Sequence, residues 1–379
     1  MGAHHPRHAV PETRRMRRLA LSVIVPIAAL TLAAMVWLWP GDGVAAPQQQ
    51  GGAEELTGEV VAIQAEECAE ELPDDVNGCG SATVQVTGGA DRGEDLEVPL
   101  PNGTGAPEVA EGDDVVLIRT GPDGDTYSIV DQQRGTGLWV LAAAFALALV
   151  AFGRWRGLAA LAGLGVTFAL LLLFVVPAIL AGEPPLLVGS CAIMLTVLYL
   201  THGFGLSTTV AVLGTLVSLT LTGLLSSLAV GALHLTGVTD DLSASVGTSQ
   251  GINTQGLLLA GIVIGSLGVL DDVTVTQSAT VTELARANPS YGLGQLYRAG
   301  SRVGRSHIAS VVNTIVLAYA GSALPLLILI VANDDSLGGV VTDQVIAQEI
   351  VRSVVATLGL VAAVPLTTGL AALTFRKRV

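Results

Sequence analysis

The sequence has few aromatic and few charged residues. Aromatic side chains make up 4% of the 379 residues, which argues against the stacking platforms that bind nucleic acids or sugars. Charged residues make up 13%, hydrophobic residues make up 51%, and the mean hydropathy is +0.63. The surface of a soluble globular protein needs more polar residues than this. The composition therefore predicts a multispanning membrane protein.

Motifs for cofactors and ordinary enzyme chemistry are also missing. The sequence contains no P-loop, nucleophile elbow, zinc signature or dinucleotide fingerprint, so ATP-driven transport and hydrolysis have no support. We expect no enzyme activity, no cofactor and no metal. The formal net charge is -14, and most of the 32 acidic residues fall between the first and second apolar runs. This charge argues against a nucleic-acid partner.

Apolar runs dominate the remaining chain, and several are long enough to cross a bilayer. Eight spans are predicted, at residues 19–39, 138–152, 157–180, 186–200, 204–235, 256–270, 307–331 and 350–375. This arrangement places nearly every arginine cluster on one side, as the positive-inside rule requires, with both termini in the cytoplasm. The predicted domains are a basic tail with an anchor span (1–40), an exported domain (54–133) and a helical bundle (137–379). Cleavage of the first span as a signal peptide stays open, although its length favours an anchor.

The exported domain has the pattern of a small β-module. Five short alternating runs, punctuated by glycine, proline and aspartate, predict about five strands between residues 54 and 133. That number suits a small barrel or partly open sandwich of the OB type. Cys68 and Cys79 flank an acidic loop and are candidates for a disulfide in an exported segment. Their pairing cannot be established from the sequence alone.

The stretch from Gly256 to Arg286 carries the main candidate site. Its apolar helix contains Gly261, Gly265 and Gly268, a smooth strip that lets another helix approach closely, and is expected to end at Asp271 and Asp272. A charged residue at membrane depth costs about 2.5 to 3.5 kcal/mol on insertion scales, so it is seldom kept without a role. The alternative, that the cytoplasmic interface simply solvates both aspartates, is about as well supported.

The span that begins near His307 offers partners for these aspartates. Asn313 and Thr314 lie inside it and need hydrogen-bond partners, which the aspartates or their own helix could supply. Two adjacent carboxylates in a low-dielectric site cannot both ionise cheaply, so we expect them to share a proton near neutral pH. Further residues are candidates for gating or support of this site: Thr274, Gln277, Arg305 and His307.

Two phrases carry a family resemblance. INTQGLLLAGIVIGSLGVLDDVTVTQ and LYRAGSRVGRSHIASVVNT resemble the YibE/F family of bacterial multispanning membrane proteins, which implies location in the bacterial plasma membrane. The family resemblance implies no particular biochemical function. The order of one span, an exported domain and a glycine-rich helix with paired aspartates more weakly resembles half of a resistance-nodulation-division or SecD-SecF transporter.

The second resemblance implies that the aspartate pair carries protons. The sequence departs from that superfamily because Gln277 and Ser278 stand where a glutamate is expected shortly after the aspartates. It also has two more predicted spans before the aspartates. Proton coupling is therefore implied at Asp271 and Asp272 only, and drug export is not implied.

Three functional classes remain open at this stage. The favoured one is a proton- or cation-coupled secondary transporter with the aspartate pair as coupling site. The alternative is a membrane scaffold or accessory protein that recruits a protein partner through its exported domain. An intramembrane enzyme is the weakest, because no second motif matches the aspartates. The expected partners are the lipid bilayer and an unidentified small solute or ion, and homo-oligomerisation is left open.

Overall fold

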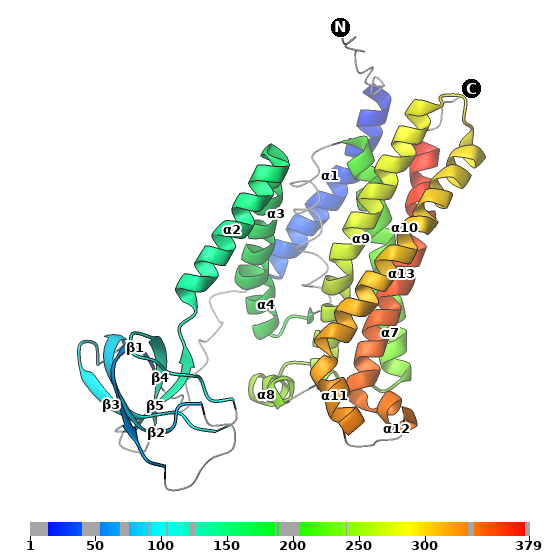
Figure 1. Ribbon diagram of the computed structural model, residues 1–379. Helices are drawn as coiled ribbons and strands as arrows, with labels where there is room; N and C mark the ends of the chain where they lie inside the picture. Colours follow the sequence, from blue (N-terminus) through cyan, green and yellow to red (C-terminus); the bar gives the residue numbers. More distant parts are fainter. Residues whose placement is uncertain are drawn as a thin grey trace. The chain divides into compact units, whose positions relative to one another are not determined.

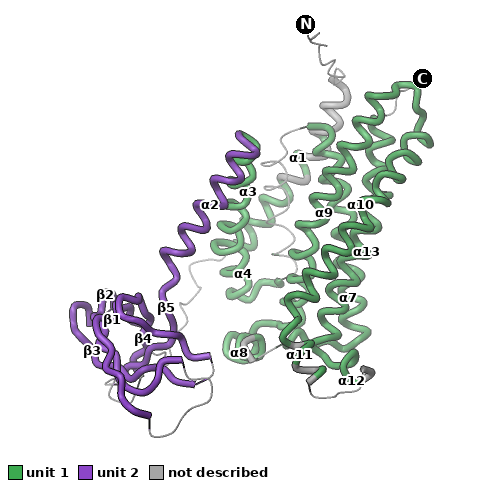
Figure 2. The backbone as a smooth tube through the Cα atoms, in the orientation of Figure 1, with its two compact units in different colours: residues 1–44, 155–379 green, residues 45–154 purple. Residues whose placement is uncertain are grey.

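The computed structural model describes most of the chain. The described residues are 14–39, 54–68, 76–89, 91–103, 105–120, 126–185, 188, 205–239, 241–332 and 337–375. They belong to two compact units (Figure 2). One unit comprises residues 45–154, and the other comprises residues 1–44 together with 155–379.

The first of these units contains an antiparallel five-stranded sheet. Its strands are β1 (Glu54–Glu66), β2 (Cys79–Gly88), β3 (Asp95–Pro99), β4 (Asp114–Thr120) and β5 (Thr126–Gln132). They confirm the five strands predicted from the alternating pattern. The strand order is β3-β2-β1-β4-β5, with the long β1 at the centre. The two edge strands, β3 and β5, approach each other.

Alternating apolar side chains build the core of this sheet. Leu56, Val84 and Leu117 are fully buried on three adjacent strands. The register of β1 against β2 shifts at two places, between Thr57 and Gly58 and between Val60 and Ala62. Such irregularities bend a strand and increase its twist, which lets one long strand pair with β2 and β4 as the sheet curls around its core.

Polar contacts connect the loops of the sheet. Cys68 and Cys79 form a disulfide across the loop between β1 and β2. Tyr127 of β5 donates a hydrogen bond to Asp91, in the connection between β2 and β3, at 2.9 Å. Arg119 of β4 lies 3.6 Å from the same carboxylate and 5.9 Å from the centre of the Tyr127 ring. Asp91 thus links the β2–β3 hairpin to the β4–β5 hairpin.

Helix α2 (Gly135–Gly153) follows the sheet and belongs to the same compact unit. It has no buried side chain within the described structure, and Phe152 is 97% exposed. An apolar helix with exposed side chains needs an apolar solvent, which agrees with a membrane span. At its start Arg134 forms an ion pair with Asp131 at 2.7 Å.

The second unit is helical. Its elements are α1 (Arg14–Trp37), α3 (Trp155–Leu170), a π-helical turn η1 (Leu171–Val175), α4 (Val176–Leu180), α7 (Leu206–Ala232), α8 (Asp241–Gln250), α9 (Thr254–Ala287), α10 (Leu293–Ser322), α11 (Leu324–Ala332), α12 (Leu337–Thr342) and α13 (Gln344–Phe375). Helices α7, α9, α10 and α13 lie side by side (Figure 1). Their contacts form the centre of the bundle.

Five helical segments among the described residues are long and apolar enough to cross a membrane: Gly135–Gly153, Trp155–Leu180, Leu206–Ala232, Thr254–Ala287 and Gln344–Phe375. They match five of the eight predicted spans. The predicted span at 186–200 lies outside the described residues, except for Val188. The predicted span at 307–331 is divided between α10 and α11. The first span is helical as α1, and the count of eight stays a prediction.

One expectation about α9 was wrong. The helix does not end at Asp271 and Asp272 but continues to Ala287. Threonine has a low helix propensity, yet residues such as Val273, Thr274 and Val281 are buried at helical spacing against neighbouring helices. Tertiary packing therefore overrides local preference. At about 1.5 Å per residue, the 34 residues of α9 extend about 51 Å, well beyond the hydrocarbon core.

The contact between Tyr127 and Asp91 predicts an alkaline titration. The hydrogen bond to Asp91, with a smaller contribution from burial, raises the pKa of Tyr127 above its ordinary value of 10.0. The folded domain therefore binds this proton more tightly than the unfolded chain does. The associated stabilisation is fully present below pH 10 and is lost as the pH rises through the higher folded-state pKa.

An alkaline titration followed by tyrosinate absorbance measures this pKa. Subtracting the curve of Tyr127→Phe from that of the unchanged chain leaves the signal of Tyr127. We expect a midpoint above 10.0, and Asp91→Asn should return it towards that value because the charged acceptor is gone. A difference curve centred at or below the ordinary value would contradict the hydrogen bond.

Candidate functional site

Polar side chains follow the buried faces of three helices in the centre of the bundle. We call this set the polar seam; it comprises Ser207, Thr215, Ser218, Thr222 and Ser226 of α7, Thr274, Gln277 and Ser278 of α9, and Thr367 and Thr368 of α13. All are fully or nearly fully buried except Ser207, which is partly buried. Buried hydroxyl and amide groups need hydrogen-bond partners, so their pairing shows how the helices are held.

Two hydroxyl pairs connect α7 to α9. Thr215 and Thr274 are 2.7 Å apart between their hydroxyl oxygens, and both side chains are completely buried. The hydroxyl groups of Ser207 and Ser278 are 3.0 Å apart, and Ser278 also donates to the Ser207 carbonyl at 2.7 Å. Because Ser278 uses its single proton on that carbonyl, Ser207 is the donor between the two hydroxyls.

Gln277 connects α9 to two other helices. Its amide nitrogen donates to Thr368 of α13 at 2.7 Å and to the Gly300 carbonyl of α10 at 2.9 Å. Thr368 in turn donates to the Val364 carbonyl at 2.6 Å. Gln277 is 4% exposed, so this three-helix junction lies inside the bundle. The sequence identified Gln277 and Thr274 as candidates, and the structure places both in the polar seam.

Glycines permit the close approach that these hydrogen bonds require. A β-carbon at Gly304 would lie 2.7 Å from the Gln277 side-chain oxygen, and one at Gly300 would lie 2.8 Å from Val281. Gly214 faces Thr367 and Gly359 faces Thr222, each with even less room for a side chain. The close contacts among α7, α9, α10 and α13 therefore depend on these four glycines.

The predicted glycine strip on α9 has a different position. Gly261, Gly265 and Gly268 are exposed, and a β-carbon at Gly261 or Gly268 would meet no described atom within 4 Å. At Gly265 it would lie 3.4 Å from the Tyr319 hydroxyl. The strip does not mediate close packing between the described helices.

The two aspartates point to different surroundings. Asp271 is half-buried, and its Oδ1 atom is shielded from solvent. Asp272 is exposed and continues the line of exposed positions that includes Gly265 and Gly268. Asp271 instead precedes Thr274 by one turn, on the side of α9 that hydrogen-bonds to α7. The pair therefore consists of one carboxylate beside the polar seam and one outside it.

The antiparallel direction of α7 and α9 identifies the level of Asp271. Thr215 of α7 contacts Thr274 of α9. Ser218 follows Thr215 by three residues and Asp271 precedes Thr274 by three residues, so in antiparallel helices the two lie at about the same level. Ser218 is completely buried, and its Oγ atom has no hydrogen-bond partner among the described residues. A hydroxyl and a carboxylate at the same level of a membrane bundle can together bind a proton or a small cation.

The remaining predicted residues are not brought into the polar seam. Asn313 and Thr314 are exposed on α10, whereas their neighbour Ile315 is buried against the bundle. Thr314 donates to the Ser310 carbonyl of its own helix at 3.1 Å. Arg305 is exposed and His307 is half-buried on the same helix. Among the described residues, no group of three or more His, Cys, Asp or Glu side chains could hold a metal ion.

Sequence reasoning missed the α7 half of the seam. Residues 206–232 contain hydroxyl residues at positions 215, 218, 222 and 226, a spacing of three and four that places them on one helix face. That periodic signal was present in the sequence. The reasoning also missed Glu349 and Arg352 of α13, which form an ion pair at 2.9 Å and are only partly exposed.

The helical bundle, the five candidate spans of the described residues and the β-sheet define a polytopic membrane protein with a small antiparallel β-domain. The model of the YibE/F-like protein family matches residues 141–377, more than half of the chain. The chain therefore belongs to the YibE/F family. The match begins within α2 and covers the whole polar seam, so the β-sheet lies outside it. No curated protein and no solved structure matches the chain.

The Thr215–Thr274 contact predicts measurable coupling between α7 and α9. Replacing both residues by valine in a double-mutant cycle keeps the side-chain shape and removes the hydroxyls. We expect a coupling energy of about 0.6 kcal/mol, the average for interhelical hydrogen bonds in membranes. Unfolding of the full chain in detergent would provide the four stabilities.

A matched cycle pairs Thr215→Val with Thr276→Val, since Thr276 is exposed on the opposite side of α9. This control should show no coupling. Equal coupling in the two cycles would contradict a specific contact between Thr215 and Thr274.

Proposed function

We propose that the chain is a proton- or cation-coupled secondary transporter in which Asp271 is the coupling carboxylate. The observation that carries this proposal is the shielded Asp271 oxygen at the level of the buried Ser218 hydroxyl. Burying a carboxylate is costly unless a proton, a cation or hydrogen bonds compensate its charge. The stability of such a carboxylate therefore changes when an ion binds to it or leaves it.

The polar seam supports a division of roles around Asp271. Thr274 donates to the Asp271 backbone carbonyl at 3.2 Å, and Ser218 supplies a buried hydroxyl at the same level of the bundle. Oxygen atoms suit both a transferred proton and a bound alkali cation. The Gln277 junction joins α9 to α10 and α13, so a shift of α9 changes both of these helix contacts together. A single charge that crosses the membrane potential gains about 2.3 kcal/mol per 100 mV, which exceeds the free energy of one such contact.

Asp272 has a different role in this proposal. Its side chain is exposed on the face opposite the seam, where solvent, lipid headgroups or another protein can reach it. The original expectation assigned coupling to both aspartates as a unit. The placement of the two side chains supports a narrower assignment to Asp271.

The proposed topology has eight spans, both termini in the cytoplasm of a bacterium and residues 54–133 exported from the plasma membrane. It is supported by the five apolar helices and by the arginine clusters between predicted spans. We further propose an OB-like class for the β-domain. Its support is the strand order, the irregular central β1 and the approach of β3 to β5, which together suit a partly open barrel.

The first test compares Asp271→Asn with Asp272→Asn. Purified protein in liposomes that contain a pH-sensitive dye, or in parallel a sodium- or potassium-sensitive dye, is exposed to a membrane potential of fixed size. Wild type should move protons, or should move sodium or potassium, and Asp271→Asn should abolish that movement because asparagine cannot titrate. Asp272→Asn is the matched control and should retain it.

Two other results of this assay would favour a different assignment. If both variants and wild type show no ion movement above empty liposomes, the scaffold alternative with its exported β-domain becomes the better one. If Asp272→Asn alone loses movement, the assignment to Asp271 is wrong. Circular dichroism and gel filtration of each variant check that the bundle has folded.

The second test addresses topology. A reporter that is active only in the cytoplasm should be active when fused after Val379, and a reporter that is active only outside should be active when inserted in the loop after Gly89. Activity of the outside reporter after Val379 would contradict the eight-span arrangement.

A further inference from the structure

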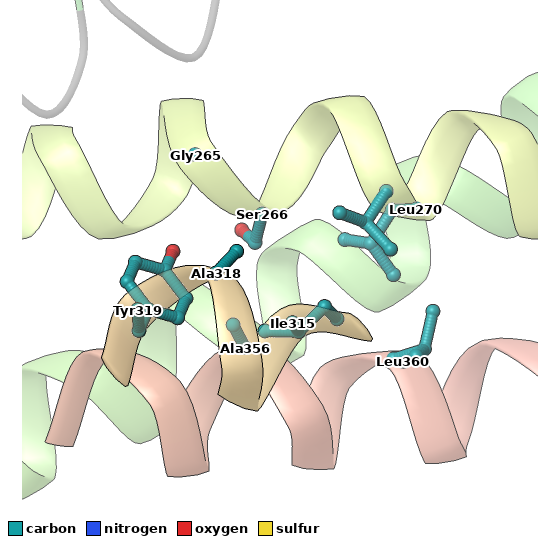
Figure 3. Close-up of a pocket in the computed structure, with 9 residues that line it drawn as sticks. Gly265, Ser266, Leu270, Ile315, Ala318, Tyr319, Ala356 and Leu360 are labelled. Carbon is teal, nitrogen blue, oxygen red and sulfur yellow. The ribbon is translucent and has the colours of Figure 1, made fainter. Parts of the chain in front are cut away.

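A cavity of about 140 Å³ lies between α9, α10 and α13 (Figure 3). Seven of its nine lining residues are glycine or apolar, and Ser266 and Tyr319 are the two exceptions. Leu270 and Leu360 lie toward one end and Tyr319 toward the other, with Ile315 between them (Figure 3). Leu270 immediately precedes Asp271, so one end of the cavity is at the level of the proposed coupling carboxylate along α9, although Asp271 does not line it.

The size and walls of the cavity limit what it can hold. An apolar protein cavity of about 150 Å³ is large enough to bind benzene. None of the lining residues is charged, so a charged solute would lose its hydration without compensation. These two limits favour a compact, neutral and largely apolar solute.

Two hydroxyl groups provide the polar contacts. Ser266 donates its proton to the Val263 carbonyl at 3.0 Å, which leaves its oxygen as an acceptor. The Tyr319 hydroxyl lies beside Gly265, on the α9 side of the cavity (Figure 3). A side chain at Gly265 would enter the space next to this hydroxyl. The glycine therefore keeps open the part of the cavity where a solute could form a hydrogen bond.

The Glu349–Arg352 ion pair lies on the side of the cavity away from Asp271. Arg352 precedes the lining residue Ala356 by one helical turn, and the charges of both residues act on Tyr319. The Arg352 Nε and Glu349 Oε2 atoms are buried and have no hydrogen-bond partner among the described residues. Along the direction of the helices, the level of the cavity is thus between an ion pair on α13 and a half-buried carboxylate on α9.

We infer that this cavity binds the transported solute, a compact neutral molecule about the size of phenol with one hydrogen-bonding group, held by Tyr319. This inference rests on the proposed transport function and specifies its substrate class. Substrate sites of secondary transporters lie near the bilayer midplane, at the interface between helices that move. Gly265 is 11 residues from the start of α9, about 16 Å along the helix, which agrees with such a depth.

Binding can be measured on the full chain in detergent by fluorine NMR with 4-fluorophenol as the probe. Wild type should show saturable binding, and Gly265→Leu should remove it by filling the cavity. Gly261→Leu is the matched control, because Gly261 lies on the same exposed strip with open space around it. Partition into micelles alone, with equal signals from all three proteins, would overturn the inference.

A second comparison does not require that the Gly265→Leu variant folds. Tyr319→Phe keeps the ring and should weaken 4-fluorophenol binding by about two- to tenfold, the value of one hydrogen bond. Binding of fluorobenzene, which has no hydroxyl, should be unchanged by the same substitution. Equal losses for both probes would show that Tyr319 only shapes the cavity and would overturn its assigned role.

The binding test is separable from the test of ion coupling. Asp271→Asn should bind 4-fluorophenol as wild type does, because Asp271 does not line the cavity. If ion movement depends on Asp271 but no probe binds, the solute site is wrong and the coupling proposal stands. If the probe binds but no ion moves in wild type, the cavity binds a ligand without serving a coupled transporter, and the inference as stated fails.

Discussion

The structure depends on satisfying polar side chains inside a bundle that water does not reach. Most hydroxyl and amide groups of the polar seam on α7, α9 and α13 pair across helix interfaces or bond to their own backbones, with Ser218 and Thr367 as exceptions among the described residues. Such short contacts require helices to approach closely, and glycines at positions 214, 300, 304 and 359 provide the space. The same constraint separates the two aspartates, since only Asp271 lies next to this interior.

The helical bundle combines a fixed junction with an ionisable group. Gln277 is buried at the junction of three helices, whereas Asp271 is six residues away, about one and two-thirds turns, and only half-buried. In the proposed coupling, a change in the charge of Asp271 would alter the cost of keeping its half-buried carboxylate in the bundle. Movement of α9 in response would be transmitted through Gln277 to α10 and α13. The cavity between those three helices would then change shape with the protonation or cation occupancy of Asp271.

Much of the fold could be predicted from sequence because its signals are local. Alternation between residues 54 and 133 gave all five strands, and apolar length gave five spans that the described helices match. The end of α9 was missed because partners on α7 and α13, rather than local propensity, keep its threonine-rich half helical. Asp271 faces the bundle interior more than Asp272 does, and Ile315 more than Asn313. Which residue of each pair faces inward depends on the rotation of its helix about the helix axis. One sequence without known contacts does not determine that rotation.

The central claim is that Asp271 changes its protonation or ion occupancy while Asp272 does not carry this role. Infrared difference spectroscopy of the full chain during a pH step, repeated with and without sodium, observes carboxyl groups directly. The account predicts a carboxyl signal in wild type that Asp271→Asn removes and Asp272→Asn retains. A signal that survives in Asp271→Asn, or that disappears only in Asp272→Asn, would contradict it.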